Sequence, residues 1–154
     1  MCIVPTLCVG TQPRTLRVPY GYFDPLDNLV GSGSVYSTVA DMALYDAALY
    51  TDLLVRQTTL AEAFKPTVLN SGRTVNYGFG WGLGHSHGRR YVGHEGAWLG
   101  FISYYVRFLD ERLGVIVSVN RDYGLPSADV ALKIADIYLT SGCLAGWSGT
   151  YSII

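Results

Sequence analysis

A histidine that precedes a glycine by two residues is the pattern in this sequence that most strongly suggests chemistry. His94 and Gly96 lie in an aromatic and apolar stretch that reads as a β-strand. Because side chains alternate along a strand, these two residues share one face and Glu95 lies on the other. The imidazole titrates near neutral pH and could bind a substrate or carry a proton. A single histidine on a strand is more often an ordinary half-buried residue, so the rest of the chain has to be weighed with it.

A second pattern, Gly84-His85-Ser86-His87-Gly88, fits the G-x-S-x-G sequence of a nucleophile elbow. An elbow needs a sharp turn from a strand into a helix. Here the residues from Arg89 to Glu95 read as another strand and leave no room for a helix. No acidic residue lies between Ser86 and His94, so the usual order of a catalytic triad also fails. We therefore expect a polar hairpin turn at this place.

Metal binding is weakly suggested by the same segment, because His85 and His87 form an H-x-H pair. A third ligand at a convincing spacing is missing, so exposed turn histidines are the better interpretation. The three cysteines have no metal-binding spacing either, and we expect free or buried thiols at Cys2, Cys8 and Cys143. We expect no metal and no other cofactor, and the redox compartment stays open.

The elements that must position these residues follow from the hydrophobic pattern. Thr38 and Asp41 form a capping-box-like helix start, and 101–109 and 113–120 flank a turn in a strong hairpin pattern. Large apolar residues alternate with glycine from Tyr77 to Gly84, which predicts a further strand. Helices, then antiparallel strands, then a helix are an α+β pattern. The 154 residues are expected to form one partial domain with an irregular lead-in (1–30), a helical part (31–70), antiparallel strands (74–120) and a C-terminal helix (127–141).

Composition narrows the classes of partner. The net charge of −1 gives no reason to expect nucleic acid, and no apolar run approaches the length of a membrane span. Apolar residues make up 49% and charged residues 15% of the chain, which argues against disorder. A mean hydropathy of +0.23 is high for a small soluble domain and suggests an incompletely covered globule.

Several short motifs occur in a fixed order between about residues 20 and 139. They are Gly21-Tyr22, the helix start Ser37-Thr38-Val39-Ala40-Asp41, Tyr77-Gly78-Phe79-Gly80-Trp81, His94-Glu95-Gly96, and an apolar strand that ends in Asn120. In this order they resemble the serine β-lactamase-like hydrolase superfamily, which includes penicillin-binding proteins, class C β-lactamases and related esterases. Each motif is weak alone, but the ordered set is fairly specific.

This resemblance implies a fold. The chain would be the C-terminal half of the penicillin-recognising fold, an antiparallel sheet with flanking helices. The sheet strands would be those around His94, at 101–109 and at 113–120, with the C-terminal helix packed on one face. The first two sheet strands and the helical region that carries the nucleophile would be missing.

The resemblance also assigns roles near the opening pattern. His94 would be the basic residue of the family's third motif, on a strand that lines the cleft. Gly96 would let the substrate backbone approach, and the amide of Ala97 would be one donor of an oxyanion hole. Glu95 departs from the threonine or serine common at its position, which leaves the substrate class open. The expected substrate-binding set is His94, Glu95, Gly96 and Ala97.

The family's nucleophile motif, S-x-x-K, is not found in these residues. The chain has two lysines, and the residues three positions before Lys65 and Lys133 are Glu62 and Val130. Ser118-Val119-Asn120 matches the second family motif, but it follows the third motif and reads as part of a strand. We therefore expect a chain without a complete catalytic centre, which is inactive alone.

Two classes of function stay open. The first is the C-terminal portion of a serine hydrolase that acts on small ester, amide or β-lactam substrates. The second is a non-catalytic binding or assembly domain on the same scaffold. Without the missing half, Val115 and Val117 would lie on an unpaired strand edge, and Leu132, Ala135 and Leu139 of the last helix would lose their cover. We therefore expect self-association through that exposed edge.

Overall fold

The structure, a computed structural model, describes residues 2–3, 33, 35–98, 100–120 and 126–140. The expected irregular lead-in (1–30), Cys8 and Cys143 lie outside these ranges, apart from Cys2 and Ile3. The strands are β1 (Cys2–Ile3), β2 (Tyr36–Ser37), β3 (Thr67–Val68), β4 (Thr74–Val75), β5 (Gly82–Ser86), β6 (Arg89–Trp98), β7 (Phe101–Phe108) and β8 (Leu113–Val119). The helices are α1 (Val39–Ala48), α2 (Gln57–Ala63) and α3 (Ser127–Thr140).

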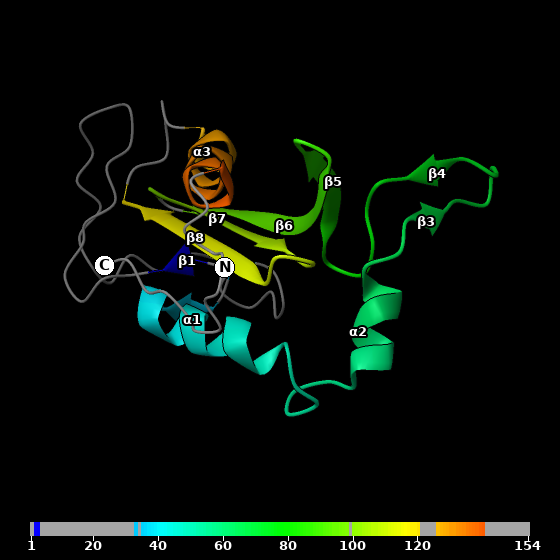
Figure 1. Cartoon of the computed structure of the whole chain (residues 1–154), viewed down its shortest axis with the longest axis horizontal. Coiled ribbons are helices and arrows are strands. Elements are labelled where there is room, and N and C mark those ends of the chain that lie inside the picture. Colours follow the sequence, from blue (N-terminus) through cyan, green and yellow to red (C-terminus); the bar gives the residue numbers. More distant parts are fainter. Residues whose placement is uncertain (1, 4–32, 34, 99, 121–125, 141–154) are drawn as a thin grey trace.

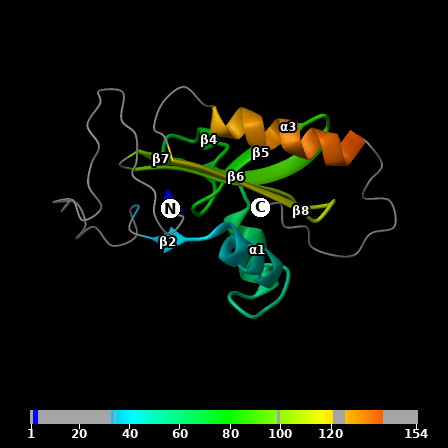
Figure 2. The ribbon, with the colours of Figure 1, turned by 90° about the vertical axis from the view of Figure 1, so that its left-hand side faces the viewer.

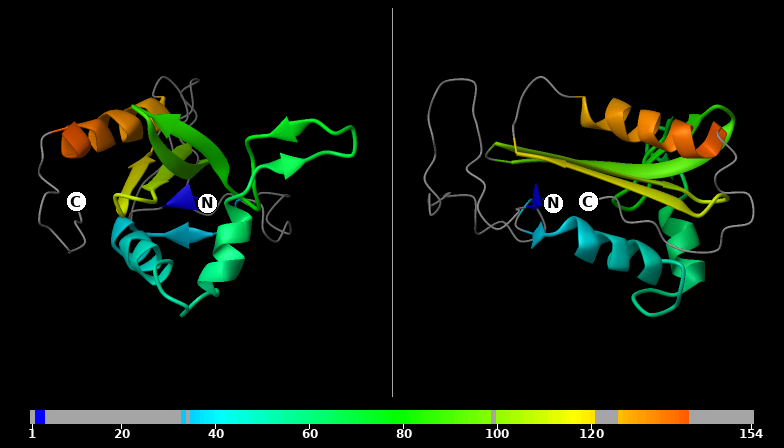
Figure 3. Two further views of the ribbon diagram at one scale, coloured as in Figure 1. Left: turned by 45° about the vertical axis from the view of Figure 1, so that its right-hand side comes forward. Right: turned by 60° about the vertical axis from the view of Figure 1, so that its left-hand side comes forward.

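The central feature is a four-stranded antiparallel sheet in the order β5-β6-β7-β8. Helix α3 lies against β7 and β8 on one face, and α1 lies against β8 on the other, so that the sheet forms the middle layer (Figures 1 and 2). The hairpin of β3 and β4 projects away from these layers beyond α2 (Figure 3). The predicted α+β class, with an antiparallel sheet and flanking helices, is confirmed.

Strands β7 and β8 and helix α3 are stabilised by a hydrophobic core that lies between them. Inward-facing residues of β7 and β8 alternate with outward-facing ones, as strand geometry requires. They meet two small helix residues that allow the helix to approach closely. This cluster of buried side chains consists of Val106, Phe108, Leu113, Val115, Ala131 and Ala135. Burial of each large apolar side chain contributes about 1.5–3 kcal/mol, so the cluster is the main source of stability on this face.

The expectation that Leu132, Ala135 and Leu139 would lose their cover is wrong. Ala135 is fully buried against the sheet, and the two leucines pack at the edge of the same cluster. The small alanines, rather than the larger residues, mark the face of α3 that approaches the strands most closely. The exposed apolar residue of this helix is Ile137, at 65% exposure.

The predicted strand from Tyr77 to Gly84 is also wrong over its first half, since β5 begins at Gly82. Gly80 adopts a positive φ of 75°, and the Gly78 amide donates to the carbonyl of Trp81 at 2.8 Å, which closes a turn. The alternating glycines arise from close approach and from turn geometry. A Cβ at Gly78 would lie 2.0 Å from the carbonyl oxygen of Ala63.

Two local predictions are confirmed. Thr38 caps α1, with its side-chain oxygen accepting from the Asp41 amide at 3.0 Å. The hairpin of 101–109 and 113–120 is present as β7 and β8, which pair from Ile102↔Val119 to Phe108↔Leu113. In the described part of the chain, no helix is long and apolar enough to cross a membrane.

Candidate active site

The strand that carries His94 is longer than its neighbour β5. Pairing between β5 and β6 ends at Gly82↔Gly93, whereas β6 continues to Trp98 and stays paired with β7 on its other side. Over the described residues, the segment 94–98 therefore has an open edge on its β5 side. Main-chain donors and acceptors at an open edge are available for an extended ligand.

A pocket of about 460 Å³ lies beside this open edge, between α1 and the sheet. Its walls come from α1, from the turn before β5 and from strands β6 to β8. Trp81 and Tyr105 pack edge to face, with ring centroids 5.6 Å apart. The lining also includes Ser37, Asp41, Met42, Tyr45, His94, Ser103 and Ile116. The pocket thus combines an apolar wall with hydroxyl, carboxylate and imidazole groups, as small-molecule sites usually do.

His94 is exposed at the rim of this pocket and is held at both ring nitrogens. Nδ1 lies 2.6 Å from the main-chain carbonyl oxygen of Glu95. Nε2 lies 2.9 Å from the hydroxyl of Tyr77. A carbonyl oxygen can only accept, so Nδ1 is the protonated nitrogen of the neutral ring. Nε2 then carries the lone pair and accepts from the Tyr77 hydroxyl.

The other expected residues are spread over both faces of β6. His94 pairs with Tyr105 and faces α1, whereas Glu95 pairs with Tyr104 on the α3 side. Burial raises the pKa of the Tyr104 hydroxyl, with further contributions from Tyr91 and Glu95, in agreement with this placement. Glu95 also borders the pocket, and we infer that it contributes main chain there rather than its carboxylate.

Gly96 and Ala97 lie further along the open segment of β6, paired with Ser103 and Ile102. Gly96 is half-buried and Ala97 is exposed. Neither belongs to the lining of the pocket itself, which ends at His94 and Glu95 on this strand. The roles expected for Gly96 and Ala97 remain predictions.

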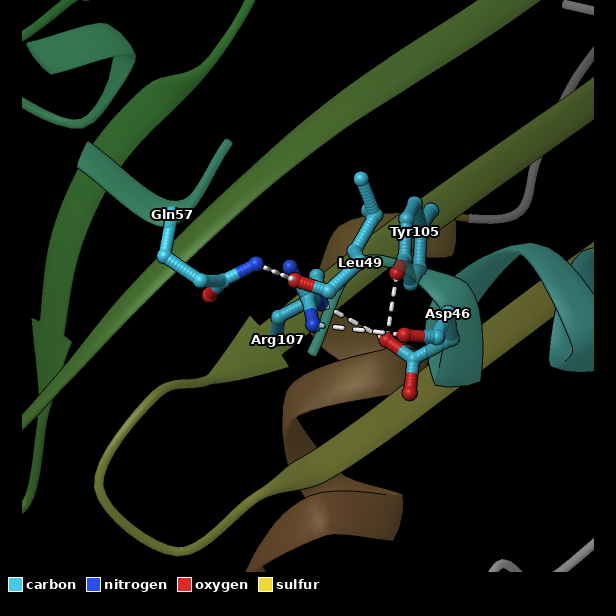
Figure 4. Close-up of polar contacts among 5 residues, drawn as sticks. All are labelled: Asp46, Leu49, Gln57, Tyr105 and Arg107. Carbon is cyan, nitrogen blue, oxygen red and sulfur yellow. Dashed lines mark hydrogen bonds and ion pairs between the residues drawn. The ribbon is translucent and has the colours of Figure 1, made fainter. Parts of the chain in front are cut away.

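A buried polar network, which the sequence did not indicate, adjoins the pocket at Tyr105 (Figure 4). Arg107 Nε donates to Asp46 Oδ1 at 2.7 Å, and the Tyr105 hydroxyl donates to the same oxygen. Asp46 and Arg107 are 6% and 1% exposed. The Arg107 guanidinium also lies over the ring of Tyr50, 4.4 Å from its centroid. The network joins α1 to β7, so that it fixes two walls of the pocket relative to each other.

This network changes the titration of its members. Burial raises the pKa of the Tyr105 hydroxyl far above its ordinary value, and the negative charge of Asp46 adds to the effect. For Tyr50, burial is again the largest cause of a raised pKa, followed by Asp46, while Arg107 opposes the shift. Both phenols therefore stay neutral at physiological pH, in keeping with a structural role.

The competing motifs do not form sites. Ser86 ends β5 and pairs with Arg89, and the connection to β6 is a tight turn in which His87 and Gly88 have φ values of 49° and 77°. Such a two-residue hairpin is not a nucleophile elbow. Ser118 lies within β8, as expected of a strand residue. Among the described residues, no group of three or more histidine, cysteine or acidic side chains could hold a metal ion.

Comparison with known proteins shows the family of this chain. Residues 6–139 match the family model described as Beta-lactamase, which is more than half of the chain. The chain therefore belongs to the β-lactamase family, and the resemblance to serine β-lactamase-like and penicillin-binding hydrolases is confirmed.

A curated relative gives the comparison more detail. Penicillin-binding protein 4* of Bacillus subtilis (strain 168) is 36% identical over 112 residues, which are 72% of this chain and 25% of that protein. The chain thus spans about a quarter of the length of this relative.

Proposed function

We propose that this chain supplies one side of a serine hydrolase active site, the side that contains His94. The substrates would be small esters, amides or β-lactams. The proposal is carried by one observation, the placement of His94 at the open edge of β6 beside a pocket with both ring nitrogens oriented. An imidazole at a pocket rim suits the binding of a polar substrate group, and it can take part in proton transfer once such a group replaces the Tyr77 hydroxyl at Nε2.

The open edge of β6 would hold the substrate. An extended acyl chain could add to segment 94–98 through main-chain hydrogen bonds. The Ala97 amide would then be one donor to the oxyanion that forms when the carbonyl is attacked. Gly96 has no side chain to block this approach.

The nucleophile is proposed to come from outside these 154 residues. No serine precedes Lys65 or Lys133 by three positions. Two serines, Ser37 and Ser103, line the pocket, but neither lies in such a motif. A serine is a weak nucleophile unless a base activates it, so the chain alone is expected to be inactive.

Hydrolysis of a chromogenic β-lactam and of p-nitrophenyl esters by the purified chain tests this proposal. We expect rates equal to a protein-free control. Saturable turnover that disappears in Ser86→Ala, Ser37→Ala or Ser103→Ala would show that the chain carries its own nucleophile and would overturn the proposal.

The second candidate is a binding domain that uses the same pocket without catalysis. The apolar wall formed by Met42, Trp81 and Ile116 favours it, because burial of apolar ligand surface gives affinity without any nucleophile. Saturable binding of an intact β-lactam or ester to the isolated chain, weakened by Trp81→Ala, would support this candidate.

A further inference from the structure

Tyr77 is the side chain outside the pocket lining that contacts His94 most directly. Its hydroxyl lies 2.9 Å from His94 Nε2, and the two rings meet edge to face with centroids 6.0 Å apart and an angle of 67°. The hydrogen bond and the ring contact together fix both the position and the tilt of the imidazole.

The backbone of Tyr77 is itself held from three sides. Its carbonyl accepts from the Thr67 amide at 3.0 Å and from the Thr67 hydroxyl at 2.7 Å. Tyr77 also forms a bridge with Gly82, the first residue of β5. The adjoining Gly78 lies so close to the carbonyl of Ala63 that no side chain fits there. These contacts fix the backbone of Tyr77, although its side chain is exposed, and they therefore fix where the side chain begins.

We propose that Tyr77 is a positioning residue of this site, which holds His94 as the Nδ1-protonated tautomer with the basic Nε2 directed at the Tyr77 hydroxyl. The Glu95 carbonyl fixes the proton on Nδ1, and the Tyr77 hydroxyl donates to the lone pair on the opposite nitrogen. Without Tyr77, the ring loses one of its two hydrogen bonds and Nε2 becomes free to carry the proton and donate to water. The importance of this for catalysis rests on the function proposed above, but the tautomer itself does not.

Nuclear magnetic resonance of the whole ¹⁵N-labelled chain tests the inference. Long-range ¹H–¹⁵N correlations report the tautomer of each neutral imidazole, and His94 is assigned by comparison with His94→Gln. The spectra are recorded at about pH 8, above the ordinary histidine pKa of about 6.5. We expect His94 to be predominantly Nδ1–H. In Tyr77→Phe, which keeps the ring contact, the ratio of Nδ1–H to Nε2–H should fall about fivefold, the usual effect of one hydrogen bond.

The controls separate a positioning role from a general disturbance. Tyr45→Phe removes a hydroxyl from a tyrosine that lines the pocket and is about as exposed as Tyr77, and it should leave His94 unchanged. His85 and His87 serve as internal references in every spectrum. A wild-type His94 that is mostly Nε2–H, or a ratio unaffected by Tyr77→Phe in a folded protein, would overturn the inference.

A second measurement, made on the wild type alone, tests the inference even if Tyr77→Phe does not fold. In the wild type, a slowly exchanging Tyr77 hydroxyl proton with a nuclear Overhauser effect to the His94 ring is expected, and free rotation of both rings would contradict the proposal. None of these readouts requires a substrate or a nucleophile. Saturable turnover by the isolated chain would overturn the proposed function but would leave this inference standing, and a different tautomer leaves the proposed hydrolase function standing.

Discussion

Asp46 and Arg107 are 61 residues apart in the sequence and form a buried ion pair with a distance of 2.7 Å between Oδ1 and Nε. Their side chains are 8% and 1% exposed. Arg107 also donates to the Asp46 carbonyl at 3.4 Å, so that helix α1 is bound to β7 through side chain and main chain. The pair holds together two elements that line the pocket, because Met42 on α1 and Tyr105 on β7 both belong to its lining.

Replacement of Asp46 should therefore be strongly destabilising. Asp46→Ala leaves the Arg107 guanidinium buried without its counter-charge, which usually costs about 3–5 kcal/mol. Chemical denaturation of the two proteins would measure this loss. The matched control is Glu62→Ala, because the Glu62–Lys65 pair has the same 2.7 Å distance but side chains that are 61% and 63% exposed. That variant should lose at most about 0.5–1 kcal/mol, and equal losses in the two variants would contradict a structural role for the buried pair.

The raised pKa of Tyr105 predicts a loss of stability in alkaline solution. Tyr105 stays protonated in the folded chain at a pH where tyrosines of the unfolded chain ionise, at about pH 10. The unfolded state then binds fewer protons than the folded state, so the free energy of unfolding falls as pH rises above about 10, by at most about 1.4 kcal/mol per pH unit for this group. Tyr105→Phe should flatten this slope. Identical slopes above pH 10 in the wild type and in Tyr105→Phe would refute the assignment.

Glycine is required at position 78 for a different reason than at position 80. A Cβ at Gly78 would strike the Ala63 carbonyl at 2.0 Å, whereas Gly80 has open space and only its positive φ of 75° to satisfy. Gly80→Ala should cost about 1–2 kcal/mol of strain. Gly78→Ala should cost more and should also move Tyr77, which thermal melts and the His94 resonances would show. A Gly78→Ala protein as stable as Gly80→Ala would mean that the turn tolerates a side chain at this position.

Removal of the His94 side chain should scarcely affect folding. His94 is exposed, and so are Tyr77 and Glu95, the two residues that contact its ring nitrogens. His94→Ala is expected to change the free energy of unfolding by no more than about 0.5–1 kcal/mol. A loss of 2 kcal/mol or more, on the scale of an unpaired buried partner, would identify a structural histidine.

Strand β8 offers a route to self-association. In the described part of the chain β8 pairs with β7 alone and ends the sheet, so that its outer edge could template a second strand. We predict dimers or larger species at concentrations on the order of tens of micromolar, measured by sedimentation velocity. Val119→Lys places a charge on this edge and should weaken the association. A well-behaved monomer with a cooperative melt would rule it out.

Local patterns predicted the local parts of the fold. The cap at Thr38, the β7–β8 hairpin and the last helix each depend on residues close together in the sequence. The alternation from Tyr77 to Gly84 gave a wrong prediction of a strand over its first half, because the same glycine repeat is compatible with a strand and with a turn. What distinguishes the two is the contact of Gly78 with Ala63, which exists only in the folded chain.

The strand that carries His94 was predictable from the sequence, whereas the role of His94 in a site stays a prediction. The partner Tyr77 could not be predicted, because it lies 17 residues away on a turn that read as a strand. The Asp46–Arg107–Tyr105 network was missed because Asp46 reads as a polar helix residue and Arg107 as an outward-facing strand residue. A charged side chain on an otherwise apolar strand such as β7 was the available signal.

The most direct test of the claim that this chain supplies the His94 side of a hydrolase site is a chimera with the longer relative. The segment of Bacillus subtilis penicillin-binding protein 4* that aligns with this chain would be replaced by this chain's residues, and the rate of labelling with a fluorescent penicillin would be measured. We predict a labelled chimera whose rate falls about 100-fold or more in His94→Ala and is unchanged in His87→Ala. A folded chimera that is labelled equally fast with and without His94 would contradict the central claim.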